Sequence, residues 1–194
     1  MSGTVPANGA AKGVDIARLP HPISPADMRE LVGLDAALVG ELGVHFSTER
    51  WGEEQFSMML PGKWQFSRVA YSTESSRMVA YWIASLRSPE HLHTHRVGVD
   101  VLARGSGVGT AMYSAVMGEA TTRRIRVLTL SIHESNETAL RFYGSLGFAP
   151  LVGDSLERFV RSKGGGRVGG DRDRLVVDGC HYLVLQLEWL GGAT

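Results

Sequence analysis

Three histidines stand at alternate positions near the middle of the chain, and their spacing suggests proton chemistry. Alternate residues of an extended strand lie on one face, so His91, His93 and His95 should share a face with Val97 and Val99. An imidazole titrates near neutral pH and can accept a proton directly or relay it through water. Solvated or packed histidines are the simpler interpretation, and a shared metal ion is a third. Because no cysteine lies nearby and no His-x-x-x-His pair follows, we expect no metal.

A glycine-rich loop follows the histidines and is suited to binding a phosphate group. It reads Arg104-Gly105-Ser106-Gly107-Val108-Gly109-Thr110. Glycines lack the Cβ that would keep an anion away from successive backbone amides, and they adopt positive φ without strain. No lysine follows the last glycine, as a Walker loop requires, and the glycines do not fit the G-x-G-x-x-G spacing. A plain turn and a nucleotide site stay open as alternatives.

The loop lies between a predicted strand and a predicted helix. Apolar residues alternate from Val97 to Val101, whereas Val108, Met112 and Val116 recur at helical spacing. The positive end of this helix and its unpaired amide donors therefore point into the loop, where a diphosphate would fit.

A second group of residues follows the next predicted strand, residues 126–132. It reads Asn136-x-x-Ala139 and then Phe142-Tyr143-x-x-Leu146-Gly147-Phe148. Together with Arg104-x-x-Gly107-x-Gly109, in this order and separation, these segments resemble the GNAT superfamily of acetyl-CoA-dependent N-acetyltransferases. The resemblance is close over residues 92–150 and weaker from residue 14 to the C-terminus.

The resemblance implies an α/β (α+β) fold with a GNAT-like mixed, mostly antiparallel sheet that splays open after its fourth strand, and with flanking helices. The fourth strand would span about residues 92–102. Its free backbone edge would pair with the pantetheine arm of coenzyme A, chiefly at Val97, Val99 and Val101, in a form of strand addition. The same valines could instead be ordinary sheet core.

The resemblance also implies acetyl-CoA as co-substrate and direct attack by the amine in a ternary complex. The residues expected to bind the cofactor are Val99, Asp100, Val101, Arg104, Gly105, Ser106, Gly107, Val108, Gly109, Thr110, Asn136 and Tyr143. Asn136 would cap a helix whether or not it also contacts a ligand. A backbone N–H near Val99 would polarise the thioester carbonyl.

Three side chains are the candidates for proton transfer. An alkylammonium must lose a proton before its nitrogen can attack, so we expect a base. His93 is the first choice and His95 the second, because they align with a His-x-His pair of the arylalkylamine N-acetyltransferases. Tyr143 is the expected acid, since a phenol with a pKa near ~10 stays protonated at neutral pH and can protonate the departing thiolate. A packed aromatic pair with Phe142 is the alternative for Tyr143.

The acceptor is expected to be a primary amine of a small molecule. Ser131 stands on the fifth strand where ribosomal-protein alanine acetyltransferases have a glutamate proposed as base, which weakens a peptide interpretation. Acetylation of a protein or peptide, at the N-terminus or a lysine, stays open, as does a non-catalytic acyl-CoA-binding module. Aromatic residues that could line the acceptor site or belong to the core are Trp51, Phe56, Trp64, Phe66 and Trp82.

Composition suits one globular enzyme domain. The chain has 194 residues, of which 43% are hydrophobic, and 20 basic residues balance 20 acidic ones. We expect a disordered tail over residues 1–13, a single domain over 14–194, and a flexible glycine-rich loop over 162–174. The balanced charge favours neither nucleic acid nor a membrane as partner, and the single Cys180 excludes an internal disulfide. A cytoplasmic protein is expected, with a homodimer left open.

The remaining elements are predicted from periodicity and capping signals. Residues 14–19 form a first strand, and Ser24 with Pro25 begins a helix. Thr48 caps a second helix that runs to Leu60. Residues 64–72 and 78–86 form a hairpin, and residues 159–160 and 182–189 form two late strands.

Overall fold

The computed structural model describes residues 11, 13–43, 49–163 and 166–189, apart from the side chain of Lys163. Most of the predicted tail, residues 1–10 and 12, lies outside the described residues, and so do Thr48 and residues 164–165 of the predicted glycine-rich loop. The helices are α1 (Pro25–Leu42), α2 (Glu53–Ser57), α3 (Lys63–Phe66), α4 (Val108–Thr122), α5 (Glu137–Ser145) and α6 (Gly153–Lys163).

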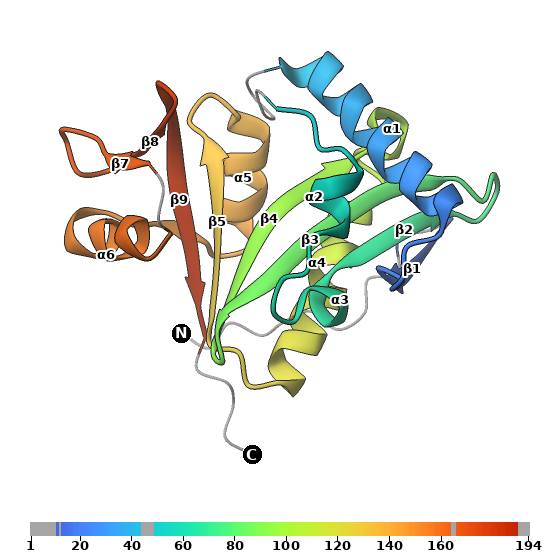
Figure 1. Ribbon diagram of the computed structural model, residues 1–194, viewed down its shortest axis with the longest axis horizontal. Helices are drawn as coiled ribbons and strands as arrows, with labels where there is room; N and C mark the ends of the chain where they lie inside the picture. The colour runs from blue at the N-terminus through green and yellow to red at the C-terminus, as the bar shows by residue number, and fades with distance from the viewer. Residues whose placement is uncertain (1–10, 12, 44–48, 164–165, 190–194) are drawn as a thin grey trace.

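A sheet runs through the molecule in the strand order β1-β2-β3-β4-β5-β9-β8-β7, and β6 also pairs with β9 (Figure 1). The strands are β1 (Val14–Arg18), β2 (Arg68–Ser72), β3 (Met78–Ser88), β4 (His91–Val99), β5 (Val127–His133), β6 (Ala149–Pro150), β7 (Arg167–Val168), β8 (Leu175–Val177) and β9 (Cys180–Glu188). Among the described strands, β4 and β5 pair in parallel, and the other paired neighbours are antiparallel. The predicted mixed, mostly antiparallel sheet with flanking helices is confirmed.

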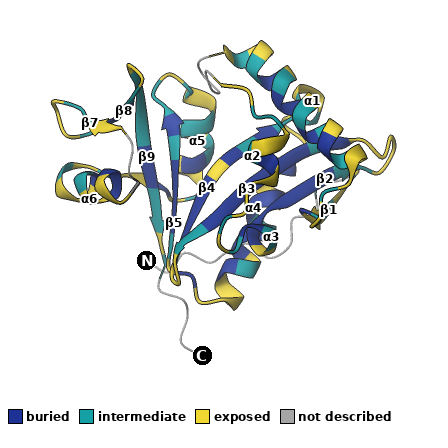
Figure 2. Cartoon of the chain, viewed as in Figure 1, coloured by how far each residue is buried: buried dark blue, intermediate teal, exposed yellow. Residues whose placement is uncertain are grey.

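The helices cover both faces of the sheet, and β3 shows how the faces are divided. Tyr81 and Trp82 are consecutive residues of β3, and both are fully buried. Their side chains point to opposite faces of the sheet. Tyr81 packs with residues of α1 and α2, whereas Trp82 packs with residues of α4 and α5. Figure 2 shows buried residues concentrated along the central strands beneath these helices. We refer below to the α1 face and the α4 face.

Helix α1 begins as its sequence predicts and packs tightly on the sheet. The side chain of Ser24 accepts a hydrogen bond from the amide of Asp27 at 3.1 Å, and Pro25 follows at the first helical position. On the sheet beneath the C-terminal half of α1, strand β4 has a glycine, Gly98. A Cβ there would lie 2.6 Å from Leu38 and from the ring of Tyr81, so only glycine lets α1 approach this strand.

The predicted second helix is wrong in its bounds. Helix α2 begins after Gly52 and ends at Ser57, and the strand predicted from residue 64 begins only at Arg68, because α3 comes first. The fully buried Lys63 explains the change: its ammonium donates to the carbonyls of Phe56 (2.6 Å) and Met58 (2.9 Å), which closes the end of α2. Burial lowers the pKa of Lys63 to about 8.

Two further expectations fail later in the chain. Phe159 and Val160, predicted as a strand, lie in α6, where with Leu156 they form a buried stripe at helical spacing. The fourth strand ends at Val99, and Val101 lies in a short 3-10 helix with 54% of its surface exposed. Val101 is therefore not an edge residue of the sheet. The predicted loop over 162–174 contains the end of α6 and the short strand β7.

Candidate active site

The site begins where β4 and β5 separate. Their parallel pairing runs from His91 opposite Val127 to Thr94 opposite Leu130. Beyond that point β4 continues to Val99 without a pairing to β5 in the described residues. Figure 1 shows the two strands diverging from the base of the sheet, with α5 packed beside β5.

A β-bulge lies at the point of separation. On the β3 side, Thr94 pairs with Ala84 and Arg96 pairs with Ile83, so His95 is an extra residue without a register partner on β3. A bulge bends its strand and increases the local twist. The bulge therefore turns β4 away from β5.

The bulge also corrects one prediction about the strand faces. Val97 and Val99 pack in the core of the α4 face, whereas the three histidines lie on the α1 face. Strict alternation predicts that all five residues lie on one face of the strand. The extra residue reverses the alternation after His95, so Arg96 points toward α1 and the valines point toward α4.

The three histidines themselves share a face, as predicted. A hydroxyl of β5 joins two of them: Thr129 Oγ1 lies 2.7 Å from His91 Nε2 and 2.9 Å from His93 Nδ1. The rings of His93 and His95 meet edge to face at 4.9 Å, and His95 Nε2 lies 2.7 Å from the hydroxyl of Ser85 on β3. These contacts form a continuous polar row across three strands.

The histidines differ in their environments. His93 is only 6% exposed and packs against the ring of Phe159 from α6, whereas His95 is exposed. Burial and the nearby guanidinium of Arg87 lower the pKa of His91 to about 4, so this side chain is neutral at neutral pH. The row therefore runs from a neutral, half-buried imidazole to a solvent-accessible one.

The glycine loop ends at the N-terminus of α4 with unused donors. Gly105 and Gly107 have φ of +74° and +88°, and a Cβ at either would meet nothing within 4 Å. The first-turn amides of Val108, Gly109 and Thr110 have no acceptor in the described part of the chain, because the first helical bond runs from Ala111 to Gly107. The loop is thus held in a left-handed conformation while its surroundings leave room for an anion.

The predicted loop arginine has a partner on another element. Arg104 makes a two-pronged ion pair with Glu41 of α1, at 2.8 and 3.0 Å, and its Nε also donates to the carbonyl of Val99. Asp100 caps the short 3-10 helix by accepting from the amide of Leu102. These contacts fix the path of the chain between β4 and the loop.

Tyr143 lies in the core of the α4 face, on the opposite side of the sheet from His93. Its ring meets those of Trp82, Phe142 and Phe148 at 5.0 to 6.1 Å. Burial raises the pKa of the Tyr143 phenol well above its ordinary value, so the hydroxyl remains protonated. The helix that carries it begins at Asn136, whose side chain accepts from the amide of Ala139 at 3.0 Å, as the capping interpretation expected.

The aromatic residues considered for the acceptor site divide into two groups. Phe56, Phe66 and Trp82 are fully buried core residues, whereas Trp51 and Trp64 are only partly buried. Beside Trp51, the buried Asp35 of α1 accepts two hydrogen bonds from Arg96, at 2.7 and 2.9 Å. This ion pair ties α1 to the strand immediately after the bulge.

Two features of β5 were not predicted as part of the site. Thr129 is fully buried between the histidines, and Ser131, two residues along the same face, has a buried hydroxyl without a hydrogen-bond partner among the described residues. No local motif marks Thr129, because its distance from His93 depends on the whole segment that joins the two parallel strands.

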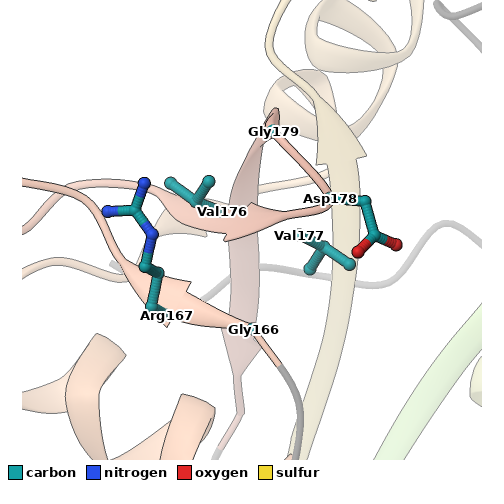
Figure 3. Close-up of a pocket in the computed structure, with 6 residues that line it drawn as sticks. All are labelled: Gly166, Arg167, Val176, Val177, Asp178 and Gly179. Carbon is teal, nitrogen blue, oxygen red and sulfur yellow. The ribbon is translucent and has the colours of Figure 1, made fainter.

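A shallow hollow occurs elsewhere, at the edge formed by β7 and β8 (Figure 3). Its lining is Gly166, Arg167, Val176, Val177, Asp178 and Gly179. The side chains of Arg167 and Asp178 point away from each other in Figure 3. None of the predicted site residues lines this hollow.

Within the described ranges, no helix has the length and apolarity needed to cross a membrane. The same residues contain no group of three or more His, Cys, Asp and Glu side chains placed to hold a metal ion.

Comparison with known proteins gives consistent matches. The model of the Acetyltransferase (GNAT) family matches residues 39–148. An uncharacterized N-acetyltransferase of Methanocaldococcus jannaschii is 34% identical over 67 residues, which cover 34% of this chain and 30% of the relative. The 5-NmdU N-acetyltransferase of Pseudomonas phage PaMx11 is 41% identical over 71 residues, 37% of this chain and 47% of the relative. The chain thus spans less than half the length of these two curated relatives.

The fold is shared with solved structures over most of the chain. The ribosomal-protein-S18-alanine N-acetyltransferase from Escherichia coli superposes with a TM-score of 0.62 and 16% identity, covering 90% of this chain and 93% of that one. At this identity the similarity concerns the fold alone.

Proposed function

Because this chain belongs to the acetyltransferase (GNAT) family, we propose that it transfers the acetyl group of acetyl-CoA to a primary amine of a small molecule, by direct attack in a ternary complex. One observation carries the proposal. The opening between β4 and β5 has the histidine row on one face of the sheet, Tyr143 on the other, and the unused amides of α4 beyond the end of β4.

The residues around the glycine loop fit coenzyme A. The amides of Val108, Gly109 and Thr110 would hold its pyrophosphate, helped by the positive end of α4. The edge of β4 from Val97 to Val99, which lacks a β5 partner, would pair with the pantetheine arm. When bound, acetyl-CoA supplies the acetyl group as an activated thioester.

The side chains would perform the proton transfers from opposite sides. His93, and His95 beside it, would take the proton of the incoming ammonium on the α1 face. Tyr143, kept protonated by burial, would donate a proton to the leaving thiolate on the α4 face. The two groups lie on opposite faces of the sheet, so each would act on a different atom of the reacting pair.

Strand β5 supports the proposed acceptor class. A carboxylate there would suit a peptide N-terminus, but the chain has the neutral Ser131, and imidazoles contact the neighbouring Thr129. The two curated relatives are named as N-acetyltransferases, which supports nitrogen as the acceptor atom.

The test is thiol release from acetyl-CoA over a panel of arylalkylamines, polyamines, amino sugars and short peptides. Tyr143→Phe and His93→Ala should each lower kcat by roughly 10²- to 10⁴-fold while the affinity for coenzyme A stays near normal. Tyr113→Phe is a matched control, because Tyr113 is also buried and its ring also meets Trp82 and Phe148. His181→Ala is the control for His93→Ala, because His181 is a partly buried histidine of β9 that was not predicted as a site residue.

Three outcomes would contradict the proposal in different ways. Unchanged turnover in both variants would defeat the assigned acid and base. Binding of coenzyme A without thiol release for any amine would indicate a non-catalytic acyl-CoA-binding module. Protection against thermal unfolding by ATP but not by coenzyme A would indicate a nucleotide site.

A further inference from the structure

The bridging hydroxyl of Thr129 carries an inference about how the proposed base works. Thr129 lies directly opposite His93 in the parallel β4–β5 register and is fully buried. Its Oγ1 is within hydrogen-bond distance of both His91 Nε2 and His93 Nδ1. A hydroxyl has one proton, so it can donate to one of these imidazoles only and must accept from the other.

Protonation of His93 leaves a single arrangement of these hydrogen bonds. Both ring nitrogens of an imidazolium are donors, so Nδ1–H of a protonated His93 must donate to Thr129 Oγ1. The hydroxyl of Thr129 must then donate to Nε2 of His91, which has to be a neutral acceptor. His91 is suited to this, because burial and Arg87 hold its pKa at about 4.

We propose that Thr129 is a positioning residue through which His91 stabilises the protonated state of His93. The proposal rests on the proposed function only in calling His93 a base. When His93 takes up a proton at Nε2, its Nδ1–H bond is retained and continues to donate to Thr129, and the Thr129 hydroxyl hydrogen stays directed toward Nε2 of His91. No further bond is made or broken in this step.

A charged side chain of β3 lies near the pair. Arg87 of β3 approaches His91 and stacks over the ring of Phe159, which is the side chain that α6 presents to His93. His95 on β4 is a titratable neighbour of His93. Arg87 lowers the pKa of His91 and so helps to keep that imidazole the neutral acceptor that the Thr129 hydroxyl needs.

The experiment is an NMR pH titration of His93 in the full chain, with its ring signals assigned from a His93→Asn spectrum. Thr129→Val keeps the shape of the side chain and removes the hydroxyl, and it should lower the pKa of His93 by about one unit. Thr129→Ser restores the hydroxyl and should restore the pKa. His91→Leu removes the final acceptor and should lower the pKa as well, which gives a second measurement if Thr129→Val does not fold.

The result that overturns the proposal is a His93 pKa that stays the same or rises in both Thr129→Val and His91→Leu. The titration does not depend on turnover, so it decides the question even if no amine is acetylated and the proposed function fails. With an active amine, the acid limb of the kcat/KM profile should move to lower pH in Thr129→Val and not in Thr129→Ser. If the acid limb of the kcat/KM profile stays at the same pH in Thr129→Val, the role of Thr129 in positioning a base is overturned.

Discussion

The buried ion pair between α1 and β4 gives the sharpest stability prediction. Asp35 is fully buried and accepts from Arg96 at 2.7 and 2.9 Å, from the hydroxyl of Tyr81 at 2.6 Å and from the amide of Trp51 at 2.8 Å. Asp35→Ala removes this carboxylate from the buried guanidinium of Arg96, which also donates to the carbonyl of Glu49.

The expected cost follows from the loss of one partner of a buried ion pair. Breaking a buried pair by removing one partner typically costs about 3–5 kcal/mol, and the better helix propensity of alanine returns less than about 0.7 kcal/mol. The free energy of unfolding should therefore fall by roughly 2–4 kcal/mol in urea denaturation. Glu41→Ala is the control on the same helix, because it removes an exposed carboxylate that also binds an arginine through two hydrogen bonds. It should cost at most about 1 kcal/mol.

A double-mutant cycle separates the ion pair from ordinary packing. Arg96→Ala alone leaves a buried carboxylate, whereas Asp35→Ala combined with Arg96→Ala leaves neither charge. The double variant should lose clearly less stability than the sum of the two single variants, by on the order of 1–3 kcal/mol. Additive losses, or a cost for Asp35→Ala no larger than that for Glu41→Ala, would refute the reasoning.

Three other predictions test separate features. Gly107→Ala should cost about 1–2 kcal/mol in chemical denaturation because its φ is +88°, whereas Gly118→Ala, which meets nothing within 4 Å inside α4, should gain up to about 1 kcal/mol. Ser131→Ala should leave the free energy of unfolding unchanged or raise it, since the buried hydroxyl has no partner in the described structure, and a loss above about 1 kcal/mol would contradict this. Burial lowers the folded pKa of Lys63 from its ordinary value of 10.5 to about 8, so the unfolded chain binds more protons between these values and stability should rise with pH there. That rise should be smaller in Lys63→Met when denaturation is repeated from pH 8 to pH 10.

The sequence predicted best where the signals were local. The strand, glycine loop and helix around Gly107 were predictable because positive φ and helical periodicity are properties of neighbouring residues. Asn136 was predictable as a cap for the same reason. The stripe of Phe159 and Val160 with Leu156 also carried a helical period, and it was misread because only the apolar pair was considered.

Other features depend on residues far apart in the sequence. Lys63 closes α2 through carbonyls that precede it, and this requires a burial that no local pattern reveals. Thr129 meets His93 because α4 brings β5 beside β4. The bulge at His95 is defined by the register against β3, so alternation alone could not show that Val97 changes face.

The bulge and the buried ion pair belong to one physical feature. Without the extra residue at His95, alternation would send Arg96 to the α4 face, away from Asp35, and Val97 to the α1 face. The Asp35–Arg96 pair therefore stabilises the bulged register over the regular one. The same bulge bends β4 away from β5 and leaves the edge from Val97 to Val99 without a strand partner in the described chain. Helix α1 thus stabilises the open edge of β4 through the buried Asp35–Arg96 ion pair. This is the edge at which we propose that the pantetheine arm binds.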